Sequence, residues 1–196
     1  VYKRQALSER LRAVPSRVTV LQHGWAHRNH APTSEKKQEL GRHRPETAVL
    51  DELDKGRRRL ESLFGPRFRP VLVPPWNRVA PSVAERIAEA GLFGVSAFGP
   101  RPRGAEAVTN THVDIVDWHG GRHFAGEAAC LDAACRLLAA RRLSEADRNE
   151  PTGLLTHHLD HDDAGWAFVD AFLAATRRHP AAAWPEPDAL FAGARR

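Results

Sequence analysis

The sequence has no methionine, one tyrosine and two cysteines among its 196 residues. A chain of this length ordinarily carries several methionines, one of them at position 1, so we interpret the true N-terminus as missing; processing or the removal of a tag is the alternative. No apolar run approaches the roughly 18 residues that a membrane span needs. The first twenty residues also lack the apolar core of a secretory signal. We therefore expect no membrane insertion, and a cytoplasmic location is slightly favoured.

Acidic residues are fewer than basic ones, which gives a net charge of +5 and a pI near 9.9. Such a balance raises the possibility of a nucleic-acid partner. The arginines, however, are scattered in short groups beside acidic residues or near helix ends, and lysine is scarce. No basic, aromatic-rich groove motif is present. We therefore expect no nucleic-acid partner.

The two cysteines, Cys130 and Cys135, lie five residues apart in a helical stretch. This spacing is neither a C-x-x-C metal motif nor one that a disulfide would bridge across a helix. We expect both to be small buried core residues.

Apolar, β-branched runs alternate with amphipathic helical stretches, which indicates an α/β fold built from βα units. The expected helices cover 4–13, 45–64, 82–90, 127–142 and 164–178, with a short final turn at 187–192. The expected strands cover 18–21, 70–73, 93–98, 113–118 and 153–156. The chain length suits one domain, residues 1–196.

Four unusual motifs each follow the end of an expected strand. They are His23, Pro75-Trp76, Asp117-Trp118 and His157. In parallel α/β folds the ligand site forms at the edge of the sheet where the strands end. We therefore predict that the four motifs converge; the alternative is that these are ordinary polar loops.

The first motif is His23-Gly24-Trp25-Ala26-His27. Two imidazoles four residues apart lie on the same side of one helical turn, so both can reach one metal ion. The alternative is a pair of exposed or capping histidines.

The last motif places His157 after an apolar strand. Such a histidine is a candidate general acid near neutral pH, and a nearby carboxylate can hold its tautomer. His157 and His158 point to opposite faces if the strand continues, so only one of them can face the site. Similarly, we expect only one of Asp114 and Asp117 to take part in the site. Another metal site or a surface cluster is the alternative.

The remaining motif is Val73-Pro74-Pro75-Trp76-Asn77. Two prolines fix the backbone, so the next amide can be aimed as an oxyanion donor. Trp76 could stack on a sugar ring. A rigid turn with a core tryptophan is the alternative.

In this order and spacing, the motifs resemble the polysaccharide deacetylase (NodB-like, carbohydrate esterase family 4) domain over about residues 15–190. The resemblance implies that His23 and His27 bind a divalent metal, with Zn²⁺ the first candidate. It also implies hydrolytic removal of N-acetyl or related acyl groups from amino sugars or glycans. The implied fold is a distorted (β/α)-barrel of the polysaccharide deacetylase type, lacking its first strand.

The resemblance also assigns roles around the metal. The catalytic residues it implies are His157 as general acid, Trp76 as backbone oxyanion donor, and Asp117 as an orienting group. The residues expected to contact substrate are Trp25, Pro75, Trp76, Asn77, Trp118 and His158.

Two departures from the family pattern affect what this chain is expected to do. Residues 1–22 contain no aspartate, although the family's first motif places an aspartate pair before the histidines. The arginine of the third motif is also out of register, since Arg69 and Arg78 only flank the proline pair. We therefore expect impaired activity. A non-catalytic carbohydrate-binding remnant and another C–N amide hydrolase are the alternatives.

Overall fold

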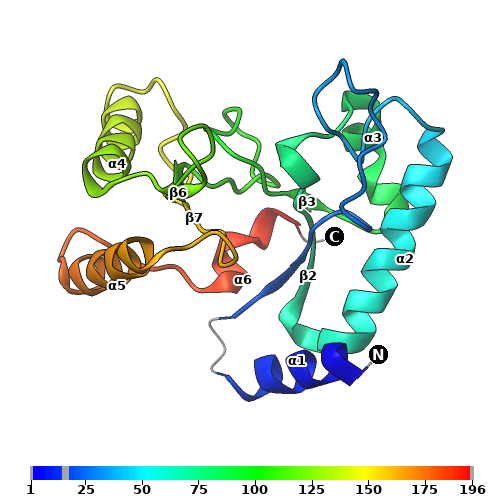
Figure 1. Cartoon of the computed structure of the whole chain (residues 1–196), viewed down its shortest axis with the longest axis horizontal. Coiled ribbons are helices and arrows are strands. Elements are labelled where there is room, and N and C mark those ends of the chain that lie inside the picture. The colour runs from blue at the N-terminus through cyan, green and yellow to red at the C-terminus, as the bar shows by residue number, and fades with distance from the viewer. Residues whose placement is uncertain (1, 15–17, 195–196) are drawn as a thin grey trace. The chain divides into compact units, whose positions relative to one another are not determined.

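A computed structural model describes residues 2–14 and 18–194 and shows a mixed α/β structure (Figure 1). Its internal contacts group the chain into two compact units. The first unit comprises Val1–Ala97, Glu106–Thr109 and Glu186–Arg196, and the second comprises Phe98–Ala105 and Asn110–Pro185. The single domain and the distorted barrel stay predictions.

The helices of the first unit begin and end at residues that favour these boundaries. Helix α2 (Glu46–Phe64) follows Pro45 and ends at Gly65, which has a positive φ of 51°. Helix α3 (Pro81–Arg86) begins on a proline and continues as a 3₁₀ turn, Ile87–Ala90. The others are α1 (Tyr2–Ala13), α6 (Pro187–Leu190) and short 3₁₀ turns at Gly65–Arg67, Pro75–Asn77 and Ala192–Ala194.

The first unit contains a three-stranded parallel sheet. Its strands are β1 (Val20–Gln22), β2 (Phe68–Leu72) and β3 (Gly94–Val95), in the order β1-β2-β3. Because the strands are parallel, the residues that follow β1 and β2 leave the sheet at the same edge. This arrangement brings the segment after Gln22 next to the segment after Leu72.

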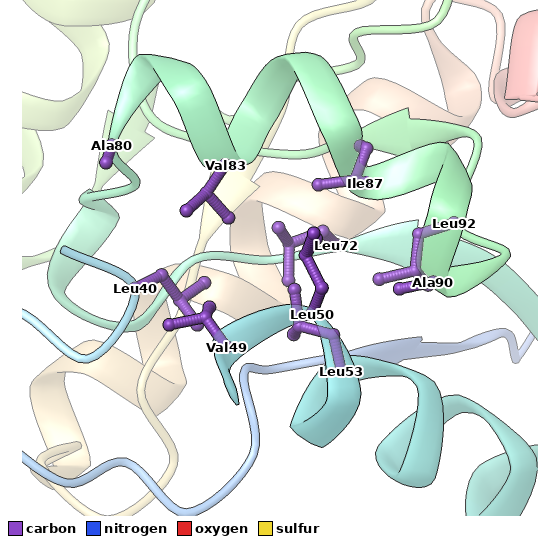
Figure 2. Packing of buried hydrophobic residues seen from close by; sticks show 10 residues of the cluster. All are labelled: Leu40, Val49, Leu50, Leu53, Leu72, Ala80, Val83, Ile87, Ala90 and Leu92. Atoms are coloured by element: carbon purple, nitrogen blue, oxygen red, sulfur yellow. The ribbon is translucent and has the colours of Figure 1, made fainter. Parts of the chain in front are cut away.

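Helices α2 and α3 enclose the hydrophobic core of the first unit. Figure 2 shows α2 side chains directed toward α3 side chains, with Leu72 of β2 between them. The cluster consists of Leu40, Val49, Leu50, Leu53, Leu72, Ala80, Val83, Ile87, Ala90 and Leu92. Leu53 and Leu72 have no exposed surface, so truncating either to alanine should cost about 2–5 kcal/mol.

The second unit contains two small sheets. Strands β4 (Val113–Asp114) and β7 (Leu154–Leu155) pair in parallel. Strands β5 (Val116–Asp117) and β6 (His123–Phe124) form an antiparallel hairpin. The expected strand 113–118 is therefore interrupted at Ile115, where Asp114 Oδ1 accepts a hydrogen bond from the Val116 amide at 3.0 Å.

Two long helices cover this part of the second unit. They are α4 (Glu127–Arg142) and α5 (Asp163–Arg178), and Asp162 caps α5 by accepting from the Gly165 amide at 2.7 Å. The buried cluster beneath them consists of Val113, Ile115, Val116, Cys130 and Phe168.

The predicted bounds of the four long helices are correct to within two residues, and the expected helix 82–90 is α3 followed by the 3₁₀ turn Ile87–Ala90, whereas every strand is shorter or shifted. The cysteine prediction is confirmed for Cys130, which is buried, and wrong for Cys135, which is exposed. Cys135 lies on the side of α4 that faces away from the cluster around Cys130. Among the helices of residues 2–14 and 18–194, none combines the length and apolar character that a membrane span requires.

Candidate functional site

His23 is the first residue after β1, and its ring is fixed by the end of the neighbouring strand. Its Nδ1 lies 3.0 Å from the carbonyl oxygen of Val73. A carbonyl oxygen can only accept, so the proton of the neutral ring sits on Nδ1 and the lone pair sits on Nε2. Metal-binding histidines typically use this arrangement, in which a backbone carbonyl orients the ring and sets its tautomer.

His27 lies close to His23 through the intervening turn. The two ring centroids are 5.1 Å apart, and the planes are tilted by 44°. The His27 ring also packs against Trp76, with centroids 4.1 Å apart. His27 has a positive φ of 53°, a backbone conformation that a non-glycine residue rarely adopts.

A buried carboxylate holds the turn between the two histidines. Glu39 is 1% exposed, and its Oε1 accepts from the Ala26 amide at 2.7 Å while Oε2 accepts from the Trp25 amide at 3.1 Å. Gly24 has a φ of 60°, and a Cβ there would overlap Glu39 Oε2 and lie 2.5 Å from Pro75 Cγ. Only glycine therefore allows the turn to pack against both neighbours.

The segment after β2 forms a tight turn beside these histidines. Pro75 is buried, and Trp76 and Asn77 both have positive φ values, 54° and 59°. The Asn77 amide donates to the Pro74 carbonyl at 2.9 Å. The predicted role of the Trp76 amide as an oxyanion donor stays a prediction.

In the second unit, His157 lies against an aspartate and a tryptophan. Its Nε2 is 3.8 Å from Asp114 Oδ2, and the same oxygen accepts from Trp118 Nε1 at 2.7 Å. The rings of Trp118 and His157 meet edge to face, with centroids 4.6 Å apart. The parallel pairing of β4 and β7 explains this contact, because Asp114 ends one strand and His157 follows the other closely.

Asp117 has a different environment from the one the sequence suggested. Its Oδ1 accepts from the amides of Gly120 at 2.8 Å and His119 at 3.0 Å. These two hydrogen bonds hold the pKa of Asp117 below its usual value. Asp114, rather than Asp117, is the carboxylate that lies beside His157.

Two further residues near His157, His161 and Arg122, were not predicted as site residues from the sequence. His161 Nε2 accepts from the His157 amide at 3.1 Å, and the His161 ring packs edge to face on Trp166. Arg122 lies over the Trp118 ring at 5.2 Å and pairs with Asp160. The spacing of His157 and His161 could have indicated the first contact. Nothing local in the sequence indicated Arg122.

The substrate-binding predictions fall on residues of varied exposure. Trp25 and Trp118 are 40% and 39% exposed, whereas Pro75 is buried. His158, one residue beyond His157, is exposed. Arg78, which flanks the proline turn, donates a hydrogen bond to the Lys37 carbonyl at 3.0 Å.

The donor set can be tested against the predicted zinc ion. The two adjacent imidazoles are suitable Zn²⁺ ligands, and the hydrogen bond from His23 to Val73 supplies the orienting contact. Among residues 2–14 and 18–194, no group of three His, Cys, Asp or Glu side chains is placed to hold a metal. Zinc binding by His23 and His27 therefore stays a prediction.

The structure thus brings together His23, His27 and Trp76 in the first unit, and Asp114, Trp118 and His157 in the second. Convergence of all four motifs stays a prediction. In comparisons with protein-family models, curated proteins and solved structures, the chain matches none.

Proposed function

We propose that this chain is a metal-dependent hydrolase of the polysaccharide deacetylase type that acts on N-acyl groups of amino sugars. The observation that carries the proposal is the hydrogen bond from His23 Nδ1 to the Val73 carbonyl, with the His27 ring 5.1 Å away. A pair of merely exposed histidines would not need an oriented ring, a glycine-only turn and a buried carboxylate to support it.

The chain's own residues would contribute three steps. His23 and His27 would hold the metal ion, which when bound supplies Lewis-acid activation of water and of the acyl carbonyl. The Trp76 amide would donate a hydrogen bond to the carbonyl oxygen as it gains negative charge. The proton released from the attacking water would pass to solvent, and His157 would donate a proton to the departing amine nitrogen.

Asp114 would position the His157 ring in this scheme. Its Oδ2 is fixed by Trp118 Nε1, and it would balance the positive charge of the imidazolium before proton transfer. Asp114→Asn should therefore reduce the rate of acyl hydrolysis, whereas Asp117→Asn should alter only the turn at Gly120.

The proposal is tested by measuring acetate release from N-acetylglucosamine oligomers, with zinc and with a chelator. We expect slow release that requires zinc and is lost in His27→Ala and in His157→Asn. His179→Asn is the matched control, because His179 is exposed and lies outside the residues predicted to contact substrate. Release that persists in the chelator, or that His27→Ala leaves unchanged, would contradict the proposal.

A non-catalytic carbohydrate-binding protein is the second candidate. It is favoured by the absence of any aspartate among residues 1–22, where the family pattern places an aspartate pair, and by the partly exposed rings of Trp25 and Trp118. This candidate predicts oligosaccharide binding of equal affinity with zinc and with chelator, and no acetate release. Calorimetric titration with the same oligomers separates the two functions.

A further inference from the structure

Helix α4 exposes apolar side chains along the face directed away from its own unit. Its inner face carries the buried residues Cys130 and Leu137, and Cys130 belongs to the second unit's hydrophobic cluster. On the outer face, Leu131 is 41% and Leu138 is 54% exposed, and the exposed Cys135 lies between them. An exposed apolar face on a helix is ordinarily covered by a neighbouring element or by a partner. Nothing else in the second unit covers this one.

The outer apolar residues form one continuous stripe with a charge at each end. Residues four and seven apart return to the same side of a helix of about 3.6 residues per turn. Glu127, Leu131, Leu138 and Arg142 follow this spacing, and all four are exposed. The stripe therefore runs from an acid at the start of α4, over two leucines, to a base at its end.

This order makes the stripe complementary to an inverted copy of itself. The pairs Glu127–Arg142 and Leu131–Leu138 share one midpoint, between Ala134 and Cys135. When two copies of α4 pack antiparallel about that midpoint, each leucine meets the other leucine of the partner helix. Each Glu127 then meets an Arg142. A two-fold axis requires this self-complementarity of a patch.

We propose that the outer face of α4 binds a second copy of this chain, with the two α4 helices antiparallel. The exposed Cys135 next to the midpoint has a small side chain, which allows the helices to approach closely. A parallel arrangement would instead place Glu127 near Glu127 and Arg142 near Arg142, where like charges repel. The charges thus favour one orientation.

The size of the stripe determines how strong this association should be. A helix of 16 residues is about 24 Å long. A contact limited to one helix pair lies at or below the about 1,200 Å² of the smallest stable interfaces. We therefore expect a reversible dimer with a Kd between about 1 µM and about 1 mM.

Sedimentation velocity of the full chain over this concentration range tests the proposal. The wild type should shift from monomer to dimer, and Leu138→Lys should raise the Kd about tenfold or more because it places a charge in the apolar contact. Leu7→Lys is the matched control, since Leu7 on α1 is also 54% exposed and should leave the dimer unchanged. Circular dichroism confirms that each variant is folded.

A second experiment tests the antiparallel orientation. In the double variant Glu127→Lys with Arg142→Glu, both charges are reversed, so it can pair with itself but places like charges opposite the wild type. A mixture of the labelled variant and wild type should form fewer mixed dimers than random pairing gives.

Three results would overturn the proposal. The first is a wild type that stays monomeric up to about 1 mM, which would leave the face for a different partner. The second is a Leu138→Lys variant that associates as the wild type does. The third is free exchange between the double variant and wild type, which would exclude this orientation.

Discussion

The buried carboxylate of Glu39 gives the most specific prediction about how the histidine turn is built. Glu39→Gln keeps the shape of the side chain but removes its charge and replaces one oxygen with an NH₂ group. Both carboxylate oxygens accept backbone N–H groups, from Trp25 at 3.1 Å and from Ala26 at 2.7 Å. In the glutamine variant, one of these amides must therefore face a second donor.

The loss of stability in Glu39→Gln has two causes, a lost hydrogen bond and an unpaired buried donor. Loss of one hydrogen bond to a charged group costs about 1.5–3 kcal/mol, and donors left buried and unpaired cost about 1–3 kcal/mol. Glu39 is 1% exposed, so water does not replace the missing acceptor. We expect the free energy of unfolding of the first unit to fall by about 2.5–6 kcal/mol, the sum of the two effects.

Urea unfolding followed by tryptophan fluorescence measures this change, because Trp25 and Trp76 belong to the affected region. Glu35→Gln is the matched control: Glu35 lies in the same loop, pairs with Arg42 and His43, and its side chain is 40% exposed. The control should change stability by less than about 1 kcal/mol.

The same variant should also weaken zinc binding at least about tenfold, since supporting contacts of metal ligands typically contribute 10- to 100-fold in affinity. A Glu39→Gln protein that unfolds at the same urea concentration as Glu35→Gln would refute this reasoning. It would show that the turn is held by its backbone and not by the carboxylate.

Three further predictions concern the turn, a buried histidine and the core. Gly24→Ala should lower the free energy of unfolding by more than about 1–2 kcal/mol, which is the usual cost of a left-handed backbone conformation at a non-glycine residue. The cost is larger here because the added Cβ also overlaps Glu39, and a urea midpoint close to that of the wild type would contradict this. Burial holds the pKa of His112 below its usual value, so the stability from its neutral ring is complete above about pH 6.5 and is lost as the pH falls through the folded-state pKa. His112→Gln should remove this pH dependence from urea midpoints, whereas the exposed control His158→Gln should keep it. Leu53→Ala should destabilise by about 2–5 kcal/mol in the same assay, and a change below about 1 kcal/mol would show that its site is not closely packed.

Much of the fold could be predicted because its boundaries are marked locally. Pro45 and Gly65 bracket α2, and Gly91 ends the 3₁₀ turn after α3 in a left-handed conformation. The apolar periodicity of the long helices is likewise a local property. The strands are only two to five residues long, so periodicity places them poorly.

The choice between two aspartates could not be made from the sequence. Alternation in an uninterrupted strand would place Asp114 and Asp117 on opposite sides, but it does not say which side faces His157. The interruption at Ile115 determines which aspartate lies near His157, because Asp114 belongs to the β4–β7 pair and Asp117 belongs to the β5–β6 hairpin. The pair Gly120-Gly121 was a signal for that hairpin.

The role of Glu39 in supporting the histidine turn could not be predicted from the sequence either. Glu39 lies 13 residues after Ala26, within a polar loop that contains other acids and bases, and nothing in its neighbours marks it as buried. Its role depends on long-range packing that places a carboxylate beneath a chain of amides. By contrast, the spacing of His23 and His27 was visible, because two ligands on one turn form a local pattern.

Calorimetric titration of the full chain with zinc tests the central proposal most directly. We predict binding near one zinc per chain that weakens at least about tenfold in both His23→Ala and His27→Ala. It should remain unchanged in the control His30→Ala, whose ring contacts Arg44 in the same loop. Zinc binding that neither histidine variant alters, or no binding by the wild-type chain, would contradict the assignment of a metal to this turn.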